Sequence, residues 1–170
     1  RIVYTESPGT GTFEVQDIPA IAEEAHKKGC VVLMDNTWSG GMFFNAFKHG
    51  VDVSIQAATK YIVGHSDAML GTVTANAANL PAVEAGFKAL GYSVGPDDVY
   101  LGLRGLRTMH VRLRQHQENA MKVASWLEGQ PEVARVLCPA LPSFPGHKLW
   151  KRDFTGASGL FSVLLKERPK

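Results

Sequence analysis

Asp35 and Lys60 have the clearest chemical potential in the sequence, because each closely follows a short apolar run. Residues 31–34 are typical of a buried strand that ends at Asp35, and residues 51–57 of a second strand that ends just before Lys60. Ligands of open α/β sheets bind beyond the carboxyl ends of parallel strands. We therefore expect a carboxylate and an amine to face one crevice. The spacing alone leaves a second interpretation open, a partly buried Asp35–Lys60 ion pair without further function.

Residues 38–50 would connect these two strands. Their length is about the dozen residues that a crossover between parallel strands requires. Their apolar side chains also predict a short helix: Met42, Phe43, Phe44, Ala46 and Phe47. Residues 31–57 are therefore predicted to form a strand–helix–strand unit.

Three sequence motifs extend this pattern: MDNTW at 34–38, ATKYIVGHSD at 58–67 and RGLRT at 104–108. In order and spacing they resemble the pyridoxal 5'-phosphate (PLP) enzymes of cysteine and methionine metabolism, the trans-sulfuration family. The resemblance covers nearly the whole chain. Within the family, SIQAATKYIVGHSDAMLGT (54–72) and GHKLWKRDFTGASGLFS (146–162) are most similar to the bacterial cystathionine β-lyases.

The resemblance implies a role for three residues. Lys60 corresponds to the lysine that forms a Schiff base with PLP and then removes the substrate Cα proton. Asp35 corresponds to the partner of the pyridinium nitrogen, and Thr59 to a hydroxyl donor for the cofactor phosphate. Many relatives have a serine where this chain has Ala57, so that hydrogen bond to the phosphate must come from elsewhere. No metal ion is expected.

The reaction implied by the resemblance is β-elimination of L-cystathionine to homocysteine, pyruvate and ammonia, a step of methionine biosynthesis. A γ-lyase or a cysteine desulfhydrase of the same family is the alternative. Residues 6–10 lack the asparagine of many γ-type relatives, and Gln56-Ala57 replaces their His-Ser pair. These departures, together with Trp38, favour the β-lyase branch.

The resemblance also implies a domain organisation. We expect a fold-type I PLP-dependent transferase-like large domain, with a mostly parallel sheet flanked by helices, over residues 1–106. Residues 107–170 would form a linker helix and the beginning of a smaller α/β C-terminal domain. The chain begins without methionine inside a strand-like run, so we expect an internal fragment of a longer enzyme. A homodimer or homotetramer with active sites shared between subunits is implied as well.

Periodicity and turn residues predict the remaining elements. Asp17 is a favourable N-cap for a helix that Gly29 would end. The other expected helices are 80–90, 97–103 and a long one from 106, and the other expected strands are 2–5, 70–75, 133–137 and 160–165.

Ser66 supplies a rival mechanism, because residues 64–68 nearly match the G-x-S-x-G elbow of serine hydrolases. An elbow requires a helix directly after the serine, whereas residues 71–75 are β-branched and strand-like. His65 and Asp67 could ligate a metal, but no third ligand accompanies them. A lone Gly9-x-Gly11 lacks the third glycine of a dinucleotide fingerprint.

A non-catalytic partner-binding module is the second rival, suggested by a basic stripe on the long helix: Arg107, Arg112, Arg114 and Lys122. Glu118 and Glu128 interrupt the stripe, and no aromatic residues are interleaved. A solvated or subunit-facing surface is therefore the favoured interpretation, without nucleic acid as a partner.

Composition is that of a soluble globular protein. The formal net charge of the 170 residues is +2, and 45% of them are hydrophobic. No apolar run approaches the ~18 residues of a membrane helix, and no charged leader opens the chain. These features predict a cytoplasmic protein without membrane contact, in which Cys30 and Cys138 stay reduced.

Overall fold

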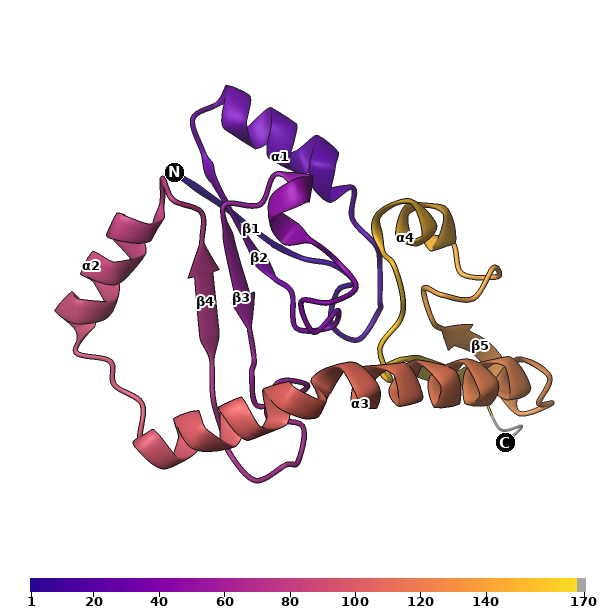
Figure 1. Cartoon of the computed structure of the whole chain (residues 1–170). Coiled ribbons are helices and arrows are strands. Elements are labelled where there is room, and N and C mark those ends of the chain that lie inside the picture. The colour runs from indigo at the N-terminus through magenta and orange to yellow at the C-terminus, as the bar shows by residue number, and fades with distance from the viewer. Residues whose placement is uncertain (168–170) are drawn as a thin grey trace.

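The computed structural model describes residues 1–167, and a four-stranded sheet lies at its centre (Figure 1). The strands follow the order β1-β2-β3-β4, in which β1, β2 and β3 are parallel and β4 is antiparallel to β3. The mostly parallel sheet of the prediction is confirmed. Its strands are β1 (Ile2–Glu6), β2 (Val31–Asp35), β3 (Val53–Gln56) and β4 (Thr72–Ala75).

Helix α1 (Ile18–Lys27) covers part of this sheet, as predicted. Its first turn is fixed by the Asp17 carboxylate, which accepts a hydrogen bond from the Ala20 N–H at 3.2 Å. Gly29, at a φ of 65°, turns the chain back toward β2. The helix buries Ile18 and Ala25, among others, against the sheet.

The connection from β2 to β3 differs from the prediction. In place of the helix expected within 38–50, only one short 3₁₀ helix forms, η1 (Ala46–His49). Gly40 and Gly41 both have positive φ, 61° and 71°, and this left-handed backbone prevents a helix from starting there. The Asn45 side chain instead accepts a hydrogen bond from Lys48 N at 3.2 Å. The crossover itself is confirmed, because β2 and β3 are parallel.

Helix α3 also differs from the prediction. One continuous helix, Pro96–Glu128, replaces the two helices expected at 97–103 and from 106. It follows α2 (Leu80–Leu90) and runs along the lower edge of the molecule toward β5 (Figure 1). Leu106 and Val123 of this helix are about half exposed, whereas Met109 and Leu113 are buried. The domain boundary expected at residue 106 lies inside this helix and stays a proposal.

After α3 the chain forms a second sheet, in which β5 (Val133–Leu137) pairs antiparallel with β6 (Ser162–Leu165). Helix α4 (His147–Asp153) lies between these strands in the sequence. One apolar core joins this segment to the first sheet, and the Phe44 and Phe154 rings lie 4.7 Å apart between centroids. Within residues 1–167, no helix is both long enough and apolar enough to cross a membrane.

Candidate active site

A cavity of about 1150 Å³ opens at the carboxyl ends of β1, β2 and β3. Its wall contains all three predicted cofactor-binding residues, Asp35, Thr59 and Lys60. The strand register explains part of this arrangement, because Asp35 pairs with Glu6 of β1 and Ile55 of β3. The end of each strand therefore delivers its following residues to the same edge. Trp38 and Ser66 line the cavity as well.

The Asp35 carboxylate is oriented by the backbone that follows it. Its Oδ1 atom accepts a hydrogen bond from Thr37 N at 2.8 Å. The Thr37 hydroxyl in turn accepts one from Ala57 N at 2.8 Å, which joins the ends of β2 and β3. Thr37 lines the cavity, and its hydroxyl has one hydrogen to donate besides the bond that it accepts.

Lys60 lies in a compact turn over residues 57–64. Lys60 N donates to Ala57 O at 2.9 Å, Val63 N to Ala58 O at 2.8 Å, and Gly64 N to Lys60 O at 2.8 Å. The Lys60 side chain is exposed along the cavity wall. Lys60 and Asp35, both within the described part of the chain, form no ion pair with each other. The interpretation of these residues as a simple ion pair is therefore wrong.

The Thr59 hydroxyl is engaged inside the protein. It accepts a hydrogen bond from Leu70 N at 2.8 Å and donates to Leu70 O at 3.2 Å. A hydroxyl has one hydrogen to donate, so a bond to a cofactor phosphate would replace the longer of these two contacts. The Leu70 N–H bond can persist in either case. The predicted phosphate contact stays a prediction.

Arg112 of α3 is a cavity residue that sequence reasoning assigned to the solvated basic stripe. Its guanidinium turns inward, and Nη2 donates to Tyr61 O and to Gly105 O, each at 2.8 Å. Burial lowers the pKa of Arg112 below its ordinary value, although a guanidinium stays charged. Gly102 and Gly105, two small residues on one face of α3, were the available sequence signal that this helix approaches another segment closely.

Ser66 lacks the surroundings of a hydrolase nucleophile. Its φ of 57° lies in the left-handed region, but β4, not a helix, is the next element. His65 Nδ1 bonds to Val63 O at 2.7 Å, and Asp67 pairs with Arg104. That hydrogen bond from Arg104 lowers the pKa of Asp67 below its usual value. Within residues 1–167, no three His, Cys, Asp or Glu side chains gather as metal ligands would.

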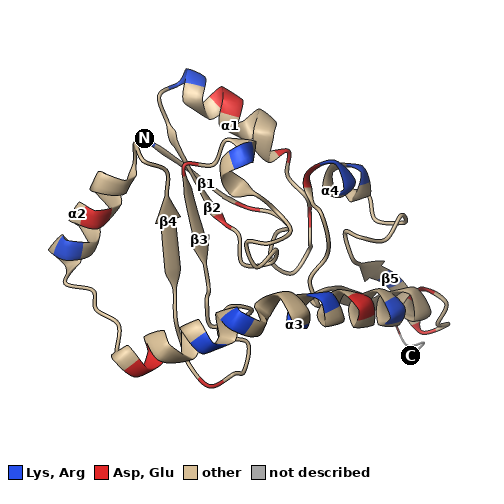
Figure 2. Ribbon diagram, viewed as in Figure 1, with Lys and Arg blue, Asp and Glu red and all other residues tan. Residues whose placement is uncertain are grey.

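The basic stripe of α3 is not a continuous surface. Figure 2 shows basic residues in succession along the middle of α3, with acidic residues at its start and again further on toward β5. The inward turn of Arg112 interrupts the stripe further. Arg114 remains exposed and contacts His110 on its own helix at 3.1 Å. The expected absence of a nucleic-acid partner stays a prediction.

Comparison with known proteins identifies the family. The model of the Cys/Met metabolism PLP-dependent enzyme family matches residues 1–170. The chain belongs to this family. It is 52% identical over 170 residues to cystathionine beta-lyase MetC of Escherichia coli (strain K12), covering 99% of this chain and 43% of that protein. The chain thus spans less than half the length of this relative.

Related proteins carry several reaction names. The solved structure of a cystathionine gamma synthase from Xanthomonas oryzae pv. oryzae, in complex with cystathionine, matches 98% of this chain and 43% of that chain. Its TM-score is 0.94 at 36% identity. An L-alanine/L-glutamate racemase of Wolbachia pipientis wMel is 41% identical over 164 residues, 96% of this chain and 41% of that protein. The match confirms the predicted α/β fold and the family, while the names of the relatives differ in their reactions.

The cavity wall has the chemistry that PLP, the cofactor of this family, requires. A primary amine can bond covalently to an aldehyde, and Lys60 supplies one without a competing ion pair to Asp35. A carboxylate can pair with a protonated pyridine nitrogen, and Asp35 keeps one oxygen beyond its bond to Thr37. The cavity also exceeds the several hundred Å³ typical of small-molecule sites. The residues present therefore fit PLP.

Proposed function

We propose that the full-length protein is a PLP-dependent carbon–sulfur lyase that cleaves L-cystathionine by β-elimination to homocysteine, pyruvate and ammonia. The observation that carries this proposal is the presence of Lys60 and Asp35 on one cavity wall without an ion pair between them. An ion pair would occupy both groups. Because Lys60 and Asp35 do not pair with each other, the amine and the carboxylate can both bind a ligand in the cavity.

Each residue has a task that follows from its chemistry. The Lys60 amine would hold the cofactor covalently and, once displaced by the substrate amine, remove the proton from the substrate Cα. When bound, PLP stabilises the negative charge that develops on that carbon. The Asp35 carboxylate would keep the ring nitrogen protonated, since an opposite charge at close range raises a pKa by about 1–3 units.

Thr59 and Thr37 would support the cofactor. The Thr59 hydroxyl would bond to the phosphate by giving up its 3.2 Å contact to Leu70 O. The Thr37 hydroxyl has a hydrogen available on the cavity wall and could supply a bond that Ala57 cannot. Both roles are part of the proposal.

A labelling experiment tests the role of Lys60. Borohydride reduction of the full-length holoenzyme, followed by peptide mass spectrometry, should locate a pyridoxyl group on Lys60. Lys60→Ala should lose both the label and activity, whereas Lys48→Ala, at an exposed lysine of η1, should keep them. Label on another lysine would contradict the proposal, and a fluorophosphonate adduct on Ser66 would favour a hydrolase.

A γ-lyase is the alternative reaction, because both reactions begin with removal of the Cα proton. Trp38 supports the β-lyase through the resemblance of its motif, and its side chain is held in place at the cavity. Its indole N–H donates to Leu160 O at 3.0 Å, and both residues line the cavity. A fixed aromatic wall restricts how the substrate can be held.

Product analysis distinguishes the two reactions. Incubation of the full-length enzyme with L-cystathionine should yield pyruvate and homocysteine. Formation of 2-oxobutyrate and cysteine would show that the opposite carbon–sulfur bond is cleaved. Racemisation of alanine without keto-acid formation would exclude both lyase reactions.

A further inference from the structure

Helix α3 contacts the Lys60 turn backbone to backbone. A Cβ atom at Gly105 would lie well inside 3.0 Å of both Ile62 O and Val63 O. Real Cβ atoms do not approach carbonyl oxygens this closely, so glycine at this position permits the contact. Helix α3, expected to contain the linker between two domains, therefore also supports the turn that carries Lys60.

Arg112 converts this contact into a hydrogen-bonded clamp. Its Nη2 atom donates to Tyr61 O in the turn and to Gly105 O in the helix, each at 2.8 Å. Its Nε atom donates to the Thr108 hydroxyl at 3.1 Å, and that hydroxyl donates to Gly105 O at 3.2 Å. The planar guanidinium is thus fixed from two directions.

The guanidinium also covers the hydrogen bond that closes the turn. A Cβ atom at Gly64 would clash with Nη1 of Arg112, so the guanidinium packs directly on the Gly64 backbone. Gly64 N is the donor to Lys60 O. Nη1 is buried and has no hydrogen-bond partner among the described residues.

We propose that Arg112 is a positioning residue that directs the Lys60 amine by holding the backbone of residues 60–64. This inference rests on the proposed function of Lys60. The backbone of residues 60–64 fixes the point from which the Lys60 side chain extends, so a shift of this turn displaces the whole side chain relative to the cavity. A displacement of about 1 Å at a reacting group can cost on the order of 100-fold in rate.

The experiment uses the full-length holoenzyme with Arg112→Met, Arg112→Lys and the control Arg114→Met. We expect Arg112→Met to lower kcat about 100-fold while KM changes less than about threefold. Hydrogen exchange of the Val63 and Gly64 amides should rise about tenfold, because their local opening becomes easier. Arg112→Lys should restore part of kcat and part of the protection from exchange. Arg114→Met should match the wild type in both properties.

Several results would overturn the inference. Unchanged exchange at Val63 and Gly64, or a change in melting temperature alone, would show that Arg112 only stabilises the fold. If Arg112→Met does not fold, Thr108→Val removes the Nε acceptor at nearly constant volume. Its kcat and exchange should then move in the same directions, and wild-type values for both would contradict the clamp.

A failure of the proposed function looks different. An active Lys60→Ala variant would show that Lys60 itself is not required, and the positioning role would fall with it. An inactive Lys60→Ala combined with an Arg112→Met variant that behaves like Arg114→Met would refute only the positioning role.

Discussion

The substitution Asp35→Asn removes the charge of the Asp35 side chain and nearly preserves its shape. In Asp35→Asn the side-chain oxygen can still accept the hydrogen bond from Thr37 N. Loss of the charge should lower kcat about 10- to 1000-fold, since a 1–3 unit change in the pKa of the ring nitrogen corresponds to about 1.4–4 kcal/mol. Steady-state kinetics of the full-length enzyme measures this effect.

The matched control for Asp35→Asn is Asp97→Asn. Asp97 is exposed in the first turn of α3 and does not line the cavity. Its substitution should change kcat by less than about twofold, because Asp97 does not line the cavity and its charge at the helix end contributes only about 0.3–1 kcal/mol to stability. Near-normal turnover of Asp35→Asn would refute the role of the carboxylate.

The Thr59 hydroxyl accepts a hydrogen bond from Leu70 N, and it can keep this bond whether or not it also donates to a phosphate. Thr59→Val would leave the Leu70 N–H without its 2.8 Å acceptor and should destabilise the full-length protein by about 1–3 kcal/mol. If the hydroxyl also donates to the phosphate, the Kd for PLP should rise about tenfold or more. Thr59→Ser should preserve both properties. Equal PLP affinities of the Val and Ser variants would exclude the phosphate contact.

Substitution by alanine should change the stability of the protein in opposite directions at Gly105 and Gly86, because the two glycines pack differently. Gly105→Ala would force α3 away from Ile62 O and Val63 O, and overpacking of this kind costs about 1–3 kcal/mol. A Cβ atom at Gly86 of α2 would meet open space, with no atom within 4 Å, so Gly86→Ala should stabilise its helix by about 0.5–1 kcal/mol. Thermal unfolding of the two full-length variants should show a lower melting temperature for Gly105→Ala and a higher one for Gly86→Ala. Equal shifts would contradict the close packing of α3.

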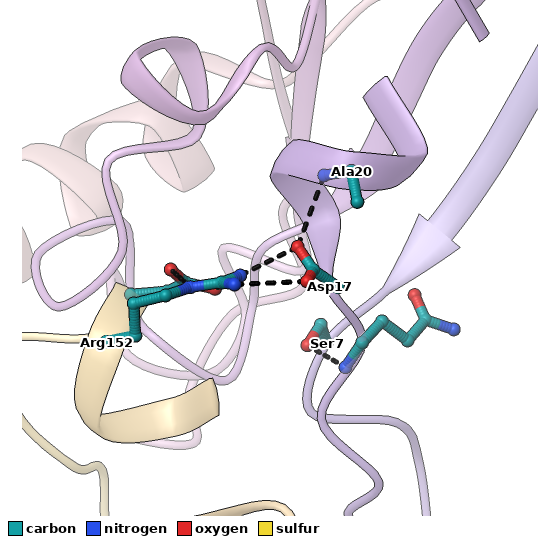
Figure 3. A network of polar contacts seen from close by, with 6 residues as sticks. Ser7, Asp17, Ala20 and Arg152 are labelled. Carbon is teal, nitrogen blue, oxygen red and sulfur yellow. Dashed lines mark hydrogen bonds and ion pairs between the residues drawn. The ribbon is translucent and has the colours of Figure 1, made fainter. Parts of the chain in front are cut away.

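Helices α1 and α4 are joined by an ion pair that Figure 3 shows from close by. Two guanidinium nitrogens of Arg152 donate to the two Asp17 oxygens at 2.7 and 3.0 Å. Arg152 also pairs with the buried Asp153 at 2.6 Å. The Arg152 hydrogen bonds hold the pKa of Asp17 below its usual range. The pair links segments that lie far apart in the sequence.

The substitution Asp17→Asn removes the ion pair with Arg152 and keeps the N-cap of α1, so it measures the contribution of the ion pair alone. Asparagine caps a helix about as well as aspartate, so the Ala20 bond should persist. The lost pair should cost about 0.5–1 kcal/mol at pH 7, because both side chains are partly exposed. Asp17→Ala, which loses the cap as well, should cost about 1 kcal/mol more.

The pH dependence of Asp17→Asn follows from the direction of the pKa shift. A carboxyl group with a depressed folded-state pKa stabilises the fold above its unfolded pKa of about 3.9 and loses that contribution as pH falls through the folded value. The melting temperatures of wild type and Asp17→Asn should therefore differ at pH 7 and converge below about pH 4. A difference that is constant with pH would show that the charge of Asp17 is irrelevant.

At the scale of the whole molecule, the expected homo-oligomer remains a prediction. Large apolar side chains are exposed on β1, α2 and α3, among them Ile2, Phe87, Leu90 and Tyr100. Such surfaces are typical of contacts with further protein. Sedimentation of the full-length protein should give a mass of two or four chains. A single-chain mass across micromolar concentrations would exclude the oligomer.

The domain division at residue 106 is likewise a proposal. The first sheet and the β5–β6 sheet are separate, and α3 runs between them without interruption (Figure 1). The apolar core nevertheless continues across both regions through Phe44 and Phe154. We therefore propose that α3 is the bridge between two regions that pack on each other.

The sequence by itself predicted the elements that local patterns control. The strands before Asp35 and Lys60, the Asp17-capped helix and the meeting of Asp35, Thr59 and Lys60 at one sheet edge were all predicted correctly. Apolar runs, caps and the shared edge of parallel strands act over short distances or through a general rule of topology. The motifs around these residues also carried the family resemblance that the match over residues 1–170 confirms.

Only the tertiary structure decided which polar groups meet. Arg112 bonds to Tyr61, 51 residues away, and Arg152 bonds to Asp17, 135 residues away. No periodicity distinguishes the inward Arg112 from the exposed Arg114 on the same helix. The hydrogen bonds of Thr59 with Leu70 also had no local signal. Such pairings depend on how helices and turns dock, and docking is set by contacts between segments that the sequence separates.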